Sequence, residues 1–133
     1  MYLIACGVLL ATGLFVNRSD RRMLALTALV GVSIFIPVPR ETAEQFYLFC
    51  AAAELTVAFS AYALRARAAG AIVDLCVLLV IVHAMGYAMD GSPPFSPYRG
   101  IVKLLEIMQL VSCIALSPVL APILRNKDAT PTT

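Results

Sequence analysis

The stretch AAGAIVDLCVLLVIVHAMGYAM, residues 68–89, decides the fold. As a helix with a rise of about 1.5 Å per residue, it is long enough to cross a hydrocarbon core of about 30 Å. Two other apolar stretches, Phe46 to Leu64 and Ile101 to Leu124, are of similar length, and two shorter ones run from Tyr2 to Val16 and from Met23 to Val38. Backbone polar groups cannot stay unpaired in lipid, so each stretch is expected to be helical. The sequence therefore predicts an all-α, multi-pass transmembrane helical bundle of five segments.

The composition supports this class. Hydrophobic residues make up 61% of the chain and charged residues 14%, with a mean hydropathy of +0.89. Soluble domains are roughly half apolar and about a quarter charged. We expect a single transmembrane helical domain over residues 1–124 and a short polar cytoplasmic tail over residues 125–133. The expected partner of the helical domain is the lipid bilayer.

The first two apolar stretches are shorter than the others. They can cross a thinned bilayer with their flanking arginines at the interface, or they can form a hairpin embedded beside three full spans. Arg18, Arg21 and Arg22 follow the first stretch and no basic residue precedes it, which is the reverse of a secretory signal. We therefore interpret the first stretch as part of the mature protein.

The distribution of lysine and arginine predicts the orientation. On alternate sides of the predicted spans, seven basic residues face three: Arg18, Arg21, Arg22, Arg65, Arg67, Arg125 and Lys127 against Arg40, Arg99 and Lys103. By the positive-inside rule, the N-terminus lies outside and the C-terminal tail lies in the cytoplasm. The predicted location is a cell membrane, of the bacterial inner-membrane type.

Ionisable residues inside the apolar stretches are the first candidates for function. A charge near the bilayer centre costs about 3 kcal/mol or more unless it is paired or hydrated. Glu54, His83 and Glu106 lie within the last three stretches, and the depths of His83 and Glu106 place them within reach of each other. With Gln109, they form the predicted intramembrane polar cluster. The alternative is a structural network in which Lys103 pairs with Glu106 and His83 bonds a backbone carbonyl.

Two patterns predict helix contacts. A polar stripe follows one face of the fifth stretch and is expected to face inward or to line an interface or lumen: Lys103, Glu106, Gln109, Cys113 and Ser117. Small residues at four-residue spacing, Gly7 with Ala11 and Thr27 with Gly31, are expected to let the first two helices pack closely or self-associate.

Several classes of function have no support in the sequence. The four cysteines form no CxxC pair, and one histidine is too few for a typical metal or haem site, so no metal and no cofactor are predicted. The basic residues are spread among short connections, which gives no nucleic-acid footprint. No catalytic motif occurs, and we expect no enzyme activity.

Three functions remain. The first is an assembly or accessory subunit that docks against other membrane subunits or against itself as a homo-oligomer. The second is a self-assembling pore, with the polar stripe facing a lumen. In size, lack of soluble domains and short basic tail, the chain resembles small phage-encoded membrane proteins such as holins, which implies lysis through self-assembled membrane lesions. The third is a small proton- or ion-coupled carrier that uses Glu54, His83 and Glu106.

Overall fold

The computed structural model describes residues 1–38, 42–89, 96–120 and 122–123. These residues form helices and connections, with no strand among them. The helices are α1 (Tyr2–Val16), α2 (Arg21–Phe35), α3 (Ala43–Leu64), α4 (Ala69–Ala88) and α5 (Ser96–Ala115). The all-α part of the fold prediction is thus confirmed.

Two helices start earlier than their apolar stretches because of N-terminal caps. The Asp20 carboxylate accepts hydrogen bonds from the backbone N–H groups of Arg22 and Met23, at 3.0 and 3.2 Å. The Thr42 hydroxyl accepts one from the backbone N–H of Gln45 at 3.1 Å. The first N–H groups of a helix lack partners within it, so these side-chain oxygens fix where α2 and α3 begin.

Helices α3 and α4 form a tight antiparallel hairpin with the most extensive contact in the bundle. Four residues, 65–68, join them. Arg65 closes α3 in the left-handed conformation, with φ 49° and ψ 37°, a position that glycine usually takes at the end of a helix. This sharp reversal lets the two helices run side by side along their whole length.

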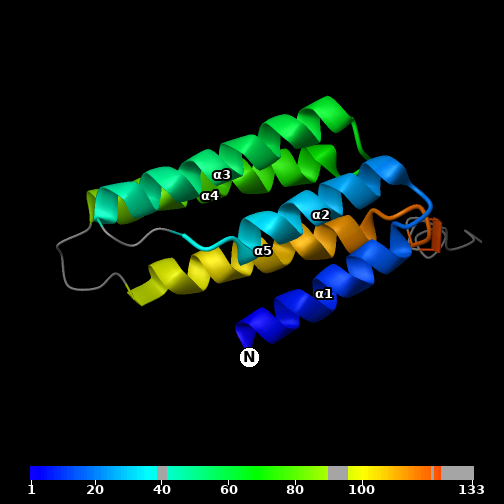
Figure 1. Cartoon of the computed structure of the whole chain (residues 1–133), viewed down its shortest axis with the longest axis horizontal. Helices are drawn as coiled ribbons and strands as arrows, with labels where there is room; N and C mark the ends of the chain where they lie inside the picture. Colours follow the sequence, from blue (N-terminus) through cyan, green and yellow to red (C-terminus); the bar gives the residue numbers. More distant parts are fainter. Residues whose placement is uncertain (39–41, 90–95, 121, 124–133) are drawn as a thin grey trace, which may run out of the picture.

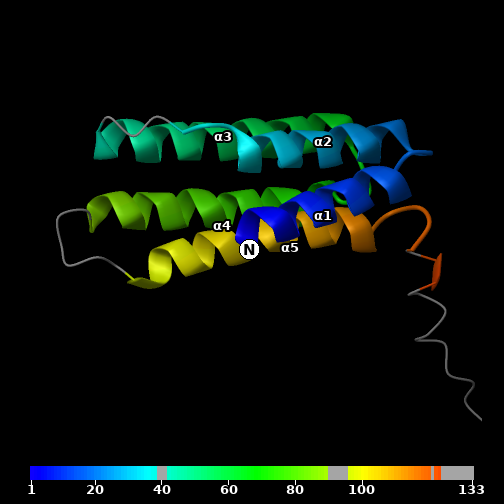
Figure 2. The same cartoon turned by 60° about the horizontal axis from the view of Figure 1, so that its bottom comes forward.

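Helices α1 and α2 form a second, shorter hairpin. Each has 15 residues, or about 22 Å at 1.5 Å per residue. The turn between them lies at the same end of the bundle as the α3–α4 turn, and the N-terminus lies beside the middle of α5 (Figures 1 and 2). The short hairpin therefore covers only half of the bundle's length.

Two of the helices in the described residues, α3 and α4, are long and apolar enough to cross a membrane by length and composition. Helix α1 is apolar but shorter. Five membrane-crossing segments therefore stay a prediction. The tail predicted over residues 125–133 lies outside the described residues.

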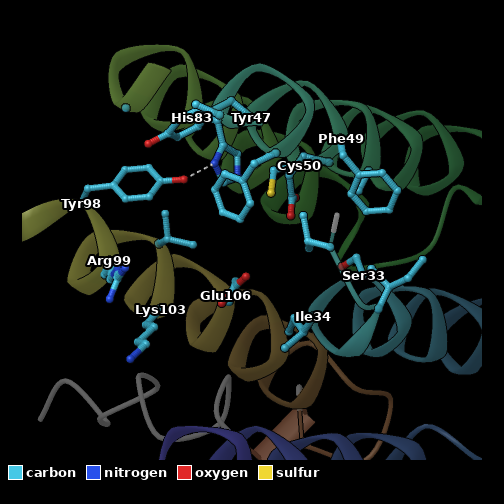
Figure 3. A pocket seen from close by; sticks show the side chains of 18 of the residues that line it. Ser33, Ile34, Tyr47, Phe49, Cys50, His83, Tyr98, Arg99, Lys103 and Glu106 are labelled. Atoms are coloured by element: carbon cyan, nitrogen blue, oxygen red, sulfur yellow. Dashed lines mark hydrogen bonds between the residues drawn. The ribbon is translucent and has the colours of Figure 1, made fainter. Parts of the chain in front are cut away.

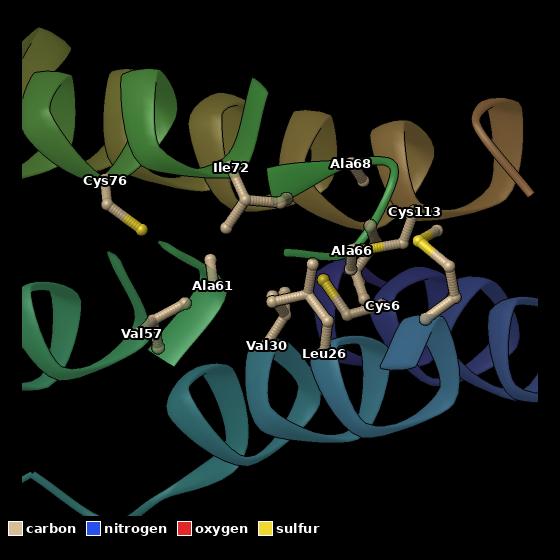
Figure 4. Packing of buried hydrophobic residues seen from close by; sticks show 12 residues of the cluster. Cys6, Leu26, Val30, Val57, Ala61, Ala66, Ala68, Ile72, Cys76 and Cys113 are labelled. Carbon is tan, nitrogen blue, oxygen red and sulfur yellow. The ribbon is translucent and has the colours of Figure 1, made fainter. Parts of the chain in front are cut away.

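The main hydrophobic core occupies the end of the bundle where all the helices are present (Figure 4). Small side chains dominate the α3–α4 side, where Ala61, Ala66 and Ala68 are buried against Ile72. Leu26 and Val30 of α2, Cys6 of α1 and Cys113 of α5 complete this cluster. Small side chains at a contact between two helices let the helix backbones approach each other closely.

The contact between α1 and α2 differs in part from the prediction. Thr27 and Gly31 are buried, and a Cβ atom at Gly31 would lie only 2.5 Å from Leu10 Cδ1. On α1, however, Gly13 makes the close approach, because its Cβ would lie 2.9 Å from Thr27 Cγ2. Gly7 has no atom within 4 Å of an added Cβ, and Ala11 is exposed. Gly7 and Ala11 therefore do not form the predicted close contact with α2, and the alternative that they mediate self-association stays a prediction.

The fifth apolar stretch also ends earlier than predicted. Helix α5 stops at Ala115, and turns follow up to residue 120. Pro118 lacks the N–H that would continue the helix. The Ser117 hydroxyl then accepts a hydrogen bond from the backbone N–H of Leu120 at 3.1 Å, which stabilises the turn.

Asn17 makes buried contacts that the sequence patterns did not single out. It directly follows the first apolar stretch, yet its side chain is fully buried. Its Nδ2 donates to Thr27 Oγ1 at 3.1 Å and to the Cys113 carbonyl at 3.0 Å. Carbonyls in the last turn of a helix lack partners within that helix, so Asn17 ties α1 to α2 and caps α5.

Candidate functional site

A cavity of about 950 Å³ lies between the free ends of the α1–α2 hairpin, where Tyr2, Ser33 and Ile34 line it, and the neighbouring parts of α3, α4 and α5. All five helices or their ends contribute to its wall (Figure 3). Tyr47 and Cys50 of α3 and His83 of α4 form one side, and Glu106 of α5 lies opposite them. The volume is near the upper end of the range for small-molecule sites.

Glu54 lies at the cavity wall and is almost fully buried, with 5% of its surface exposed. Its Oε2 accepts a hydrogen bond from Gln109 Nε2 at 3.0 Å. The same nitrogen lies 3.3 Å from Cys76 Sγ, so one amide on α5 connects α3 with α4. Gln109 is fully buried, and its Oε1 has no hydrogen-bond partner among the described residues.

Glu106 is held by the first turn of α1. The Tyr2 hydroxyl donates a hydrogen bond to Glu106 Oε2. The Lys103 ammonium lies 5.2 Å from the centroid of the Tyr2 ring, a cation–π contact. Tyr2 therefore contacts both members of the expected Lys103–Glu106 ion pair, the carboxylate through its hydroxyl and the ammonium through its ring.

His83 faces the cavity from α4 and is also nearly fully buried, with 4% exposure. Its Nδ1 lies 2.8 Å from the Tyr98 hydroxyl, drawn as the dashed line in Figure 3. The alternative structural network had a backbone carbonyl as the partner of His83, and the observed partner is this side chain near the start of α5. The sequence carries no signal for the pair, because the two residues lie on different helices.

Two tyrosine rings pack over Gly86. The Tyr47 and Tyr98 rings lie 5.7 Å apart between centroids, inclined by 68°. A Cβ atom at position 86 would lie 2.8 Å from Tyr47 Cε1 and 2.8 Å from Tyr98 Cε2. The absence of a side chain on Gly86 is therefore what lets both rings approach α4.

The predicted polar cluster lies around one cavity, but its members are not bonded to one another as a single group. Glu54, His83 and Glu106 all line the cavity. Glu54 is joined to Gln109, whereas His83 and Glu106 each bond a tyrosine. The structure thus places three ionisable side chains on a shared wall, each with its own partner.

Most of the polar stripe on α5 faces the interior of the chain. Gln109, Cys113 and Ser117 are fully buried, and Glu106 is half-buried. Lys103 is the exception, since it is exposed. Gln109, Cys113 and Ser117 are therefore enclosed by the chain's own helices.

The cavity wall offers little to a metal ion. Among the described residues, no group of three or more histidine, cysteine and acidic side chains lies close enough together to hold one. The ionisable groups are instead spread over several helices and mixed with aromatic rings.

Comparisons with protein families, with curated proteins and with solved structures found no match to this chain. The fold and the cavity therefore define its class: a small all-helical protein with an open cavity whose wall carries carboxyl, imidazole and phenol groups.

Proposed function

We propose that this chain is an integral membrane protein that works as a small proton- or cation-coupled carrier. The observation that carries the proposal is the cavity of about 950 Å³ with Glu54, His83 and Glu106 on its wall. Ionisable side chains are costly inside a membrane and, where they occur, usually face a hydrated path or a bound ion. A cavity of this size gives them such a path.

In the proposed arrangement, α3, α4 and α5 cross the bilayer and the α1–α2 hairpin is embedded beside them. Helix α1 begins next to Glu106, which lies about 15 Å along α5 from Ser96 at 1.5 Å per residue. A helix that begins at that depth spans only the cytoplasmic half of the bilayer. The cavity then occupies the outer half, and Arg99 and Lys103 lie near its mouth.

The contact between Gln109 and Glu54 provides a means of handling a proton. With Nε2 toward Glu54, the Gln109 amide donates to an ionised carboxylate. After a half-turn of the amide, Oε1 would accept the proton of a neutral Glu54. Because Oε1 has no other partner among the described residues, the turn would break no existing bond of that atom. This residue pair can therefore serve both protonation states of the acid.

The burial of the α5 stripe is the reason that we prefer a cavity within one chain to a lumen between copies. A pore of the holin type would need Gln109, Cys113 and Ser117 to face water, and all three are fully buried. An accessory subunit would work through its outer surfaces and would not need the cavity. The test below distinguishes these functions.

The experiment measures proton movement in vesicles. Purified protein is reconstituted with pyranine inside, and a pH step is applied outside in sodium, potassium or choline chloride. We expect a flux above that of protein-free vesicles in at least one medium. Glu54→Gln and Glu106→Gln should reduce it to background, whereas Glu44→Gln, an exposed acid at the start of α3, should not.

Other outcomes have separate meanings. Equal flux in the wild type and both glutamine variants, or no flux in any medium, would refute the carrier and leave the accessory subunit as the better interpretation. Release of entrapped carboxyfluorescein would instead indicate a pore. Circular dichroism and size-exclusion chromatography of each variant confirm that a lost flux does not reflect a lost fold.

The orientation is tested with an impermeant thiol reagent on intact cells. In a Cys50→Ala background, Glu44→Cys is expected to react from outside, and Arg67→Cys only after the membrane is opened. The two positions lie at opposite ends of α3 and its following turn. The reverse pattern would overturn the proposed orientation.

A further inference from the structure

The cavity wall carries aromatic side chains that a path for protons does not require. Phe46, Tyr47 and Tyr98 all line the cavity. The Phe46 and Tyr47 rings are perpendicular, with centroids 5.1 Å apart and planes inclined by 85°. Gly86 brings the Tyr47 and Tyr98 rings together against α4. Rings set at steep angles around a space can present their electron-rich faces to a cation.

The acidic part of the wall adds charge to this aromatic surface. Glu54 and Glu106 both line the cavity and are close enough to interact electrostatically. Glu54 accepts one side-chain hydrogen bond, from Gln109, and Glu106 accepts one, from Tyr2. A carboxylate has about four acceptor positions, so each keeps capacity for a ligand.

The two basic residues of the wall lie at its edge. Arg99 and Lys103 are exposed, and Lys103 already contacts the Tyr2 ring. In Figure 3, both come from the α5 side, whereas Tyr47, Cys50 and His83 come from the α3–α4 side. The acidic side chains of the wall are therefore the more buried ones, and the basic side chains are exposed.

We propose that the cavity binds an organic ammonium ion, with its positive group held between the tyrosine rings and the carboxylates of Glu54 and Glu106. This inference rests on the proposed function and names the class of solute that the carrier would take. Aromatic rings combined with carboxylates recognise substituted ammonium groups, because the rings tolerate methyl groups that would block hydrogen bonds.

The chain carries its own reporter for this site. Cys50 lines the cavity and is half-buried, whereas Cys6, Cys76 and Cys113 are buried, and all four are free thiols. A ligand in the cavity should slow the reaction of Cys50 with methyl methanethiosulfonate, a small uncharged reagent. Cys50→Ser identifies any reaction that comes from the other three thiols.

The experiment compares choline with dimethylbutanol, its uncharged carbon isostere of the same shape, on the full chain in vesicles. We expect saturating choline to slow the labelling of Cys50 about tenfold and the isostere to slow it by less than about twofold. Tetraethylammonium serves as a second, larger probe. Equal protection by choline and its isostere, or protection by neither ammonium ion while Cys50 is labelled, would overturn the proposal.

Variants of residues in the cavity wall test whether choline protects Cys50 by binding there. Tyr47→Leu and Glu54→Gln should each raise the choline concentration for half-protection about tenfold. Tyr62→Leu, on an exposed tyrosine of the same helix, should leave it unchanged. Unchanged protection in both Tyr47→Leu and Glu54→Gln would place choline elsewhere and refute the site.

The result is separable from the test of the carrier. If Cys50 does not react at all, the cavity is closed to small organic solutes and the ammonium site is refuted, while the proton flux alone decides the carrier. If proton flux depends on Glu54 and Glu106 but choline gives no selective protection, the carrier stands and the ammonium ligand is refuted. Each outcome therefore decides one proposal or both.

Discussion

The hydroxyl of Tyr98 lies 2.8 Å from Nδ1 of His83, which joins the start of α5 to the buried face of α4. Both side chains line the cavity, so this bond sets the position of one aromatic ring on its wall. In Tyr98→Phe the ring is kept and the bond is lost.

We expect Tyr98→Phe to destabilise the protein by about 1–3 kcal/mol, because the nearly buried imidazole loses its partner. The measurement is the midpoint of unfolding in mixed micelles. Tyr62→Phe, at an exposed position, is the control and should unfold like the wild type. Identical midpoints for the two variants would mean that the bond contributes nothing to stability.

Gly86→Ala is expected to disturb the aromatic wall. The new methyl group would lie 2.8 Å from ring atoms of both Tyr47 and Tyr98, so both rings must move. We expect weaker protection of Cys50 by choline and a lower unfolding midpoint. Gly70→Ala, on the same helix with no atom within 4 Å, is the matched control and should change neither quantity. If Gly86→Ala keeps the wild-type choline protection and unfolding midpoint, the two rings can move aside without loss of binding or stability.

Gly31 and Gly7 provide a test of the short hairpin. Gly31→Ala would push a methyl group to within 2.5 Å of Leu10 Cδ1, so we expect a loss of about 1–3 kcal/mol from overpacking. Gly7→Ala meets no atom within 4 Å and should be neutral or slightly stabilising. Equal unfolding midpoints for these variants would contradict the packing of α1 against α2 described above.

Asn17 connects three helices, and its replacement should be costly. Asn17→Ala removes the donor to Thr27 and to the Cys113 carbonyl, both buried, and we expect a loss of about 1–3 kcal/mol. Thr12→Ala removes an exposed hydroxyl that bonds its own helix and should change stability by less than about 0.5 kcal/mol. If both variants unfold together, the buried amide has no structural role.

Much of the fold could be predicted from the sequence because local patterns determine helices. Apolar length located the helices, and the period of about 3.6 residues predicted the inward face that carries Gln109, Cys113 and Ser117. Glu54 and His83 are nearly fully buried, as expected for ionisable residues inside apolar stretches. These features depend on one helix at a time.

The features that were missed depend on how helices meet. Nothing near Asn17 in the sequence marks it as buried, because its partners Thr27 and Cys113 lie on other helices. The cavity arises from the length difference between two hairpins, and the ring positions depend on Gly86 beside Tyr98. Such relationships require the relative placement of helices, which periodicity does not contain.

The pairing of α1 with α5 has a consequence for biogenesis. Helix α1 is made before helices α2 to α5, yet two of the groups that hold it, Glu106 for Tyr2 and the Cys113 carbonyl for Asn17, are translated about a hundred positions later. The α3–α4 hairpin, by contrast, joins neighbouring segments through four residues and can assemble as soon as it is made. Helix α1 therefore completes its contacts only when α5 is present, and chains that stop before α5 keep only its packing against α2.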